Sequence, residues 1–496
     1  MSNSSNTFQA LLDSHRQPIL AGEAHIGAPG LRARVEQLAG RLEQTGQKRV
    51  ASRLDNGLDW LVLDLALRVI DGVHVPLPTF FSEEQLRHAL HTSGAQLLVT
   101  SAAAPPPGSA GTPAPPLPGI AATSWRLAGG AGGMLPEGTA CVTYTSGSTG
   151  RPRGVCLSAD TLLTVASSLA GAARAVSPRR HLCLMPLSTL LENVAGLYAT
   201  LLAGADIALP SLQEIGYTGA SGLDVPTLLR CLHRYQPESI ILVPQLLLAL
   251  VMAAEQGATL PASLRYLAVG GGRVPTTLLA RAQVLNLPVF EGYGLTECAS
   301  VVCLNRPDAR REGSVGQPLP HAQVQVVDGE ILVSGARALG YLGGDPMPEG
   351  PIRTGDLGHI DEEGFVHVTG RRKHVFITAF GRNVSPEWVE SELMSHPSIA
   401  QALVWGEAQA DNVAVLVPRR PDVDGRVLHE ALDEINAGLP DYARIARYVR
   451  ASPFTALAGL LTANGRPKRE AILAHYQAEI DAAYRRPAIT VSGENA

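Results

Sequence analysis

Residues 144 to 155 read YTSGSTGRPRGV, a stretch in which six consecutive residues are glycine or carry a hydroxyl. Glycine permits positive φ and close approach of the backbone to a ligand, so consecutive amides can form one anion-binding concavity. No lysine follows Gly150, so this is not a Walker phosphate loop. The candidate phosphate ligands are Thr145, Ser146, Gly147, Ser148, Thr149, Gly150 and Arg153, and the Thr149 hydroxyl is also a candidate metal ligand.

The alternative is a flexible linker, the usual meaning of a Ser/Gly run. This run lies between the apolar stretches ACVTY and GVCLS, where a linker inside a core is unfavourable. We therefore favour phosphate binding.

A second glycine-rich segment, EGYGLTE, spans residues 291 to 297. Glycines on both sides leave the Tyr293 ring open for stacking, and the last two residues offer a hydroxyl and a carboxylate. The competing interpretation is a strand-end turn with a surface acid. The GGG at 270 to 272, read alone, indicates a tight exit from a strand. The candidate residues are Gly270, Gly271, Gly272, Glu291, Gly292, Tyr293, Gly294, Thr296 and Glu297.

Two further segments carry charge. In RTGDLG, residues 353 to 358, Asp356 lies between glycines, where an aspartate often satisfies its own turn. In GRRKH, residues 370 to 374, Arg371 to Lys373 read alone as a solvated basic turn. Near the chain end, LTANGRPKRE holds Arg466 and Lys468 on either side of a proline. Residues i and i+2 share a face in an extended segment, so either cation can reach one anion.

The elements that must position these residues alternate between helix and strand. The alternation recurs at 158–185, 226–243 and 276–290, and short apolar runs such as SIILVP and YLAV suit buried parallel strands. Residues 82–100 predict a helix followed by a strand, with acids in the first helical turn. We therefore expect an α/β fold with mixed and parallel sheets covered by helices.

The residue composition and pattern change twice along the chain. Residues 102–135 are rich in proline, alanine and glycine and predict a flexible loop. From about residue 313 period-2 patterns predict hairpins, with turns at Asp328-Gly329 and at 361–364. A smaller α+β segment follows Arg371. We expect a large domain over 1–372 and a small, mobile C-terminal domain over 373–496.

Composition narrows the class of protein. A chain of 496 residues with a net charge of −5 argues for more than one domain and against a nucleic-acid partner. The six cysteines form no CxxC and suit reduced thiols. No secretory signal or transmembrane run is visible, so we expect a cytoplasmic protein.

The motifs, in this order, resemble those of the ATP-dependent adenylate-forming (AMP-binding, ANL) superfamily. The resemblance spans roughly residues 30 to 470 and is greatest to the fatty and long-chain acyl-CoA synthetases. It implies that residues 145–150 bind phosphate, that Tyr293 stacks on adenine, that Thr296 contacts the α-phosphate and that Glu297 helps to hold Mg²⁺. It further implies that the 270–272 segment lies beside adenine and the acyl group. Lysine is usual where Arg153 stands.

The resemblance also assigns roles in the C-terminal motifs. Asp356 accepts hydrogen bonds from the ribose hydroxyls, and Arg371 contacts the ribose or phosphate. Lys373 falls on the hinge between the domains, and Gly381 lies near the channel for the thiol.

Residues 185–192, MPLSTLLE, resemble a further segment of the acyl-CoA synthetases, LPLAHxxE. Glu192 matches its acid, and Thr189 stands where histidine is expected. With Gly270, these residues are the expected acyl-pocket residues. Leu190 offers no counter-ion to an α-ammonium group, so we expect an uncharged acyl chain and favour a fatty acid over an amino acid.

The family's catalytic lysine aligns with Arg466. Three interpretations stay open: Arg466 serves directly through a bidentate guanidinium, Lys468 serves instead, or neither works well. The expected reaction joins a carboxylic acid to ATP as acyl-AMP with loss of pyrophosphate, then transfers the acyl group to a thiol of CoA or a separate phosphopantetheine carrier protein. The alternative is a catalytically weak nucleotide- or acyl-binding member of the superfamily.

Overall fold

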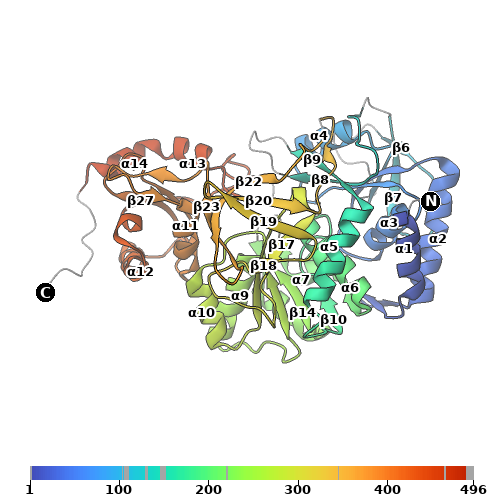
Figure 1. Cartoon of the computed structure of the whole chain (residues 1–496), viewed down its shortest axis with the longest axis horizontal. Coiled ribbons are helices and arrows are strands. Elements are labelled where there is room, and N and C mark those ends of the chain that lie inside the picture. The colour runs from blue at the N-terminus through green and yellow to red at the C-terminus, as the bar shows by residue number, and fades with distance from the viewer. Residues whose placement is uncertain are drawn as a thin grey trace.

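The computed structural model describes residues 3–102, 104, 111–128, 132–145, 152–218, 222–344, 346–462 and 465–486. These residues form a mixed α/β protein with a large N-terminal part, blue to yellow in Figure 1, and a separate C-terminal domain, orange to red. The expected fold class is confirmed. No helix in the described ranges is both long and apolar enough to cross a membrane.

A nine-stranded sheet runs through one half of the large domain. Its six central strands, β1, β11, β10, β14, β15 and β16, are parallel, and its edge strands are antiparallel. The strands, in spatial order, are β18 (Gln317–Pro318), β17 (Ser300–Leu304), β16 (Val289–Leu295), β15 (Tyr266–Val269), β14 (Ser239–Leu242), β10 (Arg180–Leu182), β11 (Asp206–Ala208), β1 (Ile19–Ala21) and β2 (Ala24–Ile26).

An eight-stranded sheet forms the other half. Its centre, β8-β4-β3-β5, is parallel, and β9 pairs antiparallel with β8. The strands, in spatial order, are β21 (Gly340–Tyr341), β9 (Arg153–Ser158), β8 (Thr139–Thr145), β4 (Val73–Pro76), β3 (Arg49–Arg53), β5 (Leu97–Thr100), β7 (Thr123–Leu127) and β6 (Gly111–Pro113).

Helices join the two sheets into one core. Buried side chains of both sheets pack with α1 (Asn3–Ser14), α2 (Ala28–Thr45), α3 (Leu58–Val69), α5 (Ala159–Ala172), a π-helix (Leu191–Tyr198) and α6 (Ala199–Ala203). Helix α3 is buried on all sides from Trp60 to Val69. Within this helix Arg68 Nη2 lies 2.9 Å from Asp64 Oδ1, and His74 Nδ1 lies 2.7 Å from the same oxygen. The buried charges are therefore compensated.

The outer faces carry the remaining helices of the large domain. Helix α4 (Glu83–Ser93) begins at Ser82 with a capping box and packs on the eight-stranded sheet, and the predicted acids lie in its first turn. The nine-stranded sheet is covered by α7 (Leu212–Ile215), α8 (Val225–Tyr235), α9 (Pro244–Glu255) and α10 (Thr276–Val284). A two-residue pair, β12 (Tyr217–Thr218) with β13 (Gly222–Leu223), follows α7.

The expectation of a loop over residues 102–135 is wrong for part of this range. Strands β6 and β7 form there, and β7 pairs antiparallel with β5 over four residues. Trp125 is 9% exposed and packs in the core beneath α4. Packing of Trp125 in the core and pairing of β7 with β5 therefore give regular structure to a segment whose composition alone predicts a loop.

A four-stranded antiparallel sheet lies between the two halves and the chain's C-terminal part. Its order is β19 (Ala322–Val327), β20 (Glu330–Gly335), β22 (Ile352–Ile360) and β23 (Val366–Arg371). The turn at Asp328 and Gly329 has φ values of 50° and 74°, the left-handed pair of a tight hairpin. The hairpin predicted at 361–364 also forms, between β22 and β23. These two hairpins place Asp356 and Arg371 opposite each other.

The C-terminal domain has its own core around the sheet β26-β27-β28. Figure 1 shows it beside α10 of the large domain. Its elements are β24 (Phe376–Ile377), β25 (Asn383–Val384), α11 (Pro386–Ser395), β26 (Ile399–Trp405), β27 (Asn412–Pro418), α12 (Gly425–Ala437), β28 (Ile445–Arg450), α13 (Arg469–His475) and α14 (Gln477–Tyr484).

Candidate functional site

A cleft of about 2790 Å³ lies where the large domain faces the C-terminal domain. Segments far apart in the sequence line it together: the end of β8, the 270–272 glycines, residues 292–297, Asp356, and residues 465–467. The sequence motifs therefore converge on one cavity.

The centre of the cleft is a chain of polar contacts. The Tyr293 hydroxyl donates a hydrogen bond of 2.6 Å to Asp356 Oδ2, and Arg371 Nε lies 3.3 Å from Asp356 Oδ1. Arg371 also donates to the carbonyl of Thr354 at 3.1 Å. Burial raises the pKa of the Asp356 carboxyl, while Tyr293 and Arg371 oppose this change. A carboxylate held in this way can accept hydrogen bonds from a diol.

Arg466 faces the same region from the C-terminal domain. It lines the cleft, and Thr462 holds its backbone through the Arg466 amide and carbonyl, at 3.0 and 2.8 Å. Surrounding protein lowers the pKa of its guanidinium, and the positive charge of Arg371 lowers it further. Two guanidinium groups kept near each other at a cleft favour an anion between them.

Lys468 takes a different position. It is absent from the residues that line the cleft, and it stands at the N-cap position of α13 without a side-chain capping hydrogen bond. The next residue, Arg469, is tied to Glu390 at 2.7 Å in the domain's interior. The geometry thus directs Arg466, and not Lys468, to the cavity.

Glu297 also lines the cleft, and a residue outside the sequence motifs orients it. The Tyr341 hydroxyl donates a hydrogen bond of 2.9 Å to Glu297 Oε1. The guanidinium of Arg153 stacks over the Tyr341 ring, 3.8 Å from its centre. Arg153 itself is not among the lining residues. Its stacking explains how the longer, planar side chain is accommodated where lysine is usual.

Glycine is required at two points around this site. Gly294 lies against the next strand, because a Cβ there would come 1.6 Å from the Ser300 carbonyl oxygen. Gly271 has a φ of 78° directly after β15, which turns the chain away from the sheet. Both glycines, with Gly270, Gly272 and Gly292, line the cleft.

The predicted phosphate segment is only partly within the described residues. Thr145, the last residue of β8, lines the cleft and pairs with Arg153 across the β8–β9 hairpin. Ser146, Gly147, Ser148, Thr149 and Gly150 lie outside the described residues.

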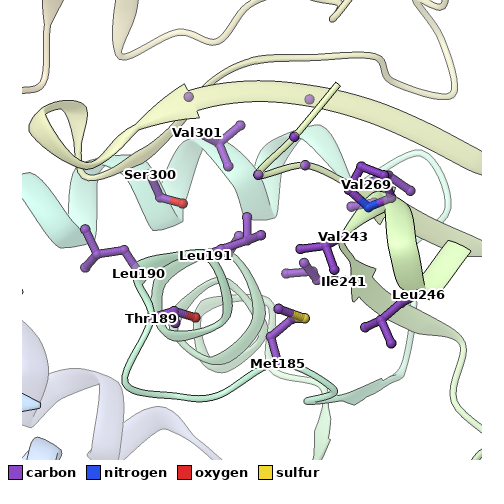
Figure 2. A pocket seen from close by; sticks show the side chains of 18 of the residues that line it. Met185, Thr189, Leu190, Leu191, Ile241, Val243, Leu246, Val269, Ser300 and Val301 are labelled. Carbon is purple, nitrogen blue, oxygen red and sulfur yellow. The ribbon is translucent and has the colours of Figure 1, made fainter. Parts of the chain in front are cut away.

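An apolar recess continues from the 270–272 glycines, and Figure 2 shows it from close by. Leu191 and Val301 point into it from opposite sides, and among the labelled residues Thr189 and Ser300 carry hydroxyl groups. None of the side chains labelled in Figure 2 carries a charge. They are Met185, Thr189, Leu190, Leu191, Ile241, Val243, Leu246, Val269, Ser300 and Val301.

Glu192 does not line this recess, contrary to the sequence-based expectation. It is fully buried, accepts a hydrogen bond of 2.8 Å from the Met185 amide and lies 2.9 Å from His181 Nε2. Gly196 leaves room for the pair, since a Cβ there would come 1.9 Å from the carboxylate. Glu192 therefore holds the strand-to-helix segment that carries Met185.

His181 and Glu192, together with Cys183, place three ligand atoms within 4.8 Å of one another. All three residues are buried, and His181 Nδ1 lies 3.0 Å from the hydroxyl of Ser239. Both carboxylate oxygens of Glu192 already have partners in the protein. We interpret the cluster as a hydrogen-bonded support of the recess.

Glu291 is a further expected contact that does not reach the cleft. It is 8% exposed, and burial raises the pKa of its carboxyl to about 8. The Val274 amide and the charge of Arg273 oppose the rise. Glu291 thus faces the start of α10 and not the cavity.

The predicted hinge and thiol-channel residues lie on the surface near the domain junction. Lys373 is exposed in the turn between β23 and β24, and Gly381 is exposed in the turn between β24 and β25, with a φ of 72°. Neither lines the cleft in this arrangement of the domains. Their roles stay predictions.

Tyr341 is the site residue that sequence reasoning missed. It stands in a short GYL segment without an accompanying acid or cation, so the only available signal is an aromatic residue after a glycine. Its importance comes from the pairing of β21 with β9, which brings it to Arg153.

Profiles of known protein families match both parts of the chain. The profile of the AMP-binding enzyme family matches residues 29–342, and that of the AMP-binding enzyme C-terminal domain matches residues 373–488. The boundary expected at residue 372 stays a prediction.

Two curated relatives are similar over most of their length. Long-chain-fatty-acid–CoA ligase FadD15 of Mycobacterium bovis is 27% identical and aligns over 81% of this chain and 77% of its own. A 2-succinylbenzoate–CoA ligase of Bacillus cereus is 28% identical and aligns over 85% of this chain and 89% of its own.

A solved structure shows the same fold. The o-succinylbenzoate CoA synthetase of Bacillus subtilis, in complex with its acyl-adenylate, superimposes with a TM-score of 0.74 at 24% identity, over 95% of this chain and 97% of that one. The same enzyme has also been solved with ATP and magnesium ion. That structure superimposes with a TM-score of 0.73 at 23% identity, over 95% of this chain and 99% of that one. The family profile, which matches more than half of the chain, confirms the resemblance: the chain belongs to the AMP-binding enzyme family.

Proposed function

We propose that this protein is an ATP-dependent acid–thiol ligase that forms acyl-AMP and then an acyl thioester. The observation that carries the proposal is the convergence of Tyr293, Asp356, Arg371 and Arg466 on one cleft beside an apolar recess. The CoA ligase activity of the two curated relatives supports it.

The chain's own residues suit the first half-reaction. The Tyr293 ring offers a stacking face for adenine, and Asp356 offers acceptors for the ribose hydroxyls. Thr145, Thr296 and the glycine segments line the same cleft, and we assign them to the phosphates. The acid's carboxylate attacks the α-phosphorus, and pyrophosphate leaves. The protein contributes positioning and charge neutralisation.

Arg466 is the cation that we assign to this step. Its guanidinium can bridge the acyl carboxylate and the α-phosphate with parallel hydrogen bonds. Arg371 on the opposite wall adds positive charge. Lys468 is not directed into the cleft, so we assign it no part in adenylate formation.

Magnesium fits the site through Glu297. A hard divalent cation takes carboxylate oxygens, and Glu297 lines the cleft with one oxygen fixed by Tyr341. Thr149, the other candidate ligand, lies outside the described residues. When bound, Mg²⁺ would neutralise phosphate charge.

The acceptor of the second half-reaction is a thiol. We propose CoA, as the names of both curated relatives suggest, with a carrier-protein pantetheine as the alternative. For this step the C-terminal domain would turn about Lys373, withdraw Arg466 and bring Gly381 to the cleft. The protein would work in the cytoplasm, where its six free, buried cysteines stay reduced.

For the acid, we propose a fatty acid or another uncharged apolar acid. The recess in Figure 2 offers aliphatic side chains and two hydroxyls, and the side chains labelled there include no cation for a second carboxylate. A charged tail would lose its hydration without compensation. 2-Succinylbenzoate, the acid of one relative, is therefore the less favoured candidate.

The test is acid-dependent exchange of labelled pyrophosphate into ATP across fatty, aromatic and dicarboxylic acids, followed by mass spectrometry of products with CoA or a holo-carrier protein. We expect exchange with apolar acids and an acyl-CoA product. Binding of ATP without exchange for any acid would favour the catalytically weak binding protein instead.

A further inference from the structure

The interface between α10 of the large domain and α11 of the C-terminal domain contains a buried carboxylate. Glu392, on α11, is only 6% exposed. Its Oε1 accepts hydrogen bonds from the backbone amide and the hydroxyl of Thr276, both at 3.3 Å. Its Oε2 accepts a hydrogen bond of 2.8 Å from the hydroxyl of Thr277. Three donors of one domain thus hold one acid of the other.

Glu392 supplies what the start of α10 lacks. The residue at the N-cap position is Pro275, which has no side-chain group to accept from the first amides of the helix. The amide ends of a helix favour a negative charge, so Glu392 acts as a cap provided by the neighbouring domain. Burial lowers the pKa of the nearby Arg273, and the charges of Glu291 and Glu392 oppose that change.

Further contacts at the same place fix the direction of α11. Ser395, one turn after Glu392, lies 3.0 Å from the Thr277 hydroxyl. Its carbonyl accepts a hydrogen bond of 2.7 Å from Arg281 Nη1, and Arg281 is anchored to Glu255 within the large domain. The contact set is therefore directional and does not rest on apolar packing alone.

This interface is connected to the nucleotide cleft on both sides. On the large domain, the Gly270–Gly272 segment leads through Arg273 directly into α10. On the C-terminal domain, one family profile covers both Glu392 and Arg466, and Arg466 lines the cleft near the charge of Arg371. Holding α11 on α10 therefore holds Arg466 in position.

We propose that Glu392 is a positioning residue that latches the C-terminal domain in the orientation for acyl-adenylate formation. The proposal rests on the proposed function. Glu392 acts through Arg466 and touches no reacting atom. Its contacts with Thr276 and Thr277 must break before the domain can turn for thiol transfer, so the latch favours the first half-reaction over the second.

The kinetic test separates the two half-reactions in the full-length protein. Glu392→Ala, Glu392→Gln and Thr277→Val should each lower acid-dependent pyrophosphate exchange, about tenfold for the alanine variant, because charge-assisted hydrogen bonds are lost. Thioester formation from supplied acyl-adenylate and CoA should stay within about twofold of the wild-type rate or rise. The effects of Glu392→Gln and Thr277→Val should be non-additive when combined.

Glu430→Gln, an exposed acid on α12 of the same domain, is the matched control and should change neither half-reaction. Equal losses in both half-reactions for the Glu392 variants would show a merely structural role and overturn the proposal. Unchanged exchange in all of them would also overturn it.

A second readout does not depend on activity. All six native cysteines are buried, so spin labels can be directed to Val284→Cys on α10 and Val427→Cys on α12, which are 81% and 40% exposed. The labelled protein should show one main inter-label distance, and Glu392→Gln should broaden or shift it. If no acid supports pyrophosphate exchange in the wild type, only the proposed function is refuted. The distance measurement would still test whether Glu392 holds the two domains together. An unchanged distance distribution would refute it.

Discussion

Replacing Glu291 by glutamine should stabilise the large domain, increasingly so as the pH rises. The carboxyl of Glu291, on β16 opposite the last residue of β15, is buried, and its pKa rises from 4.5 to about 8. Glutamine keeps the shape and an oxygen that can accept from the Val274 amide. It cannot ionise, so the comparison isolates the charge.

The direction in which stability changes with pH follows from proton binding by the folded and unfolded chains. Below about pH 4.5 the carboxyl is protonated in both the folded and the unfolded chain, so it adds no pH dependence. Between there and about pH 8 the unfolded chain releases the proton and the folded chain keeps it. Stability of the wild type then falls as pH rises, by about 1.4 kcal/mol per pH unit. Over the whole window the loss is about 3 to 5 kcal/mol.

The assay is urea-induced unfolding of wild type and Glu291→Gln at several pH values between about 5 and about 8.5. Fluorescence of Trp60 and Trp125 reports the large domain when Trp388 and Trp405 are replaced by phenylalanine in both proteins. The stability gain of the variant should be small near pH 5 and grow with pH until it levels off above about 8.

The exposed Glu312 provides the control, since Glu312→Gln should show a constant offset from the wild type. A stability difference between wild type and Glu291→Gln that does not change with pH would refute the reasoning. It would mean that Glu291 ionises in the folded protein as readily as in the unfolded chain.

Five further substitutions test the site. Tyr341→Phe keeps the ring under Arg153 but loses the hydrogen bond to Glu297, the proposed Mg²⁺ ligand, so the Mg²⁺ concentration for half-maximal exchange should rise about threefold to tenfold; an unchanged Mg²⁺ dependence would contradict this role. Asp356→Asn should raise KM for ATP by about tenfold or more, measured in the same exchange assay, because an amide accepts fewer hydrogen bonds from the ribose. Leu191→Arg introduces a cation into the recess and should lower kcat/KM for fatty acids about a hundredfold while improving that for dicarboxylic acids relative to the wild type. Arg466→Gln should slow exchange about a hundredfold and Lys468→Gln less than about threefold; the reverse order would reassign the catalytic cation.

Local signals in the sequence were sufficient for many elements. The acids in the first turn of α4 and the turn pair Asp328-Gly329 are local signals, so a helix start and a hairpin could be placed without knowing the rest of the fold. Strands β6 and β7 could not be placed in this way. Their order depends on pairing with β5, a contact that composition does not encode.

The same distinction between local motifs and contacts among distant elements applies to the candidate site. The resemblance of the glycine, tyrosine and acidic motifs to the adenylate-forming superfamily indicated which segments converge, and the cleft brings Tyr293 and Asp356 together as expected. The direction of individual acids was not predictable. Glu192 and Glu291 lie in motifs but turn inward, because burial depends on neighbours such as His181 and Val274 from other elements.

The residues missed by sequence reasoning share one property. Tyr341 and Glu392 act through partners that are 44 and about 115 positions away, Glu297 and the two threonines of α10. No local pattern marks such residues, since the pairing arises only when strands or domains come together.

The central claim is that the converging segments join a carboxylic acid to AMP through one of the acid's own oxygens. The most direct measurement uses a fatty acid whose carboxylate carries oxygen-18, with ATP, Mg²⁺ and CoA, and determines the mass of the nucleotide product. Our account predicts AMP that contains one oxygen-18 atom, because the thiol displaces AMP with that oxygen attached. Unlabelled AMP, or release of ADP and phosphate in place of AMP and pyrophosphate, would contradict it.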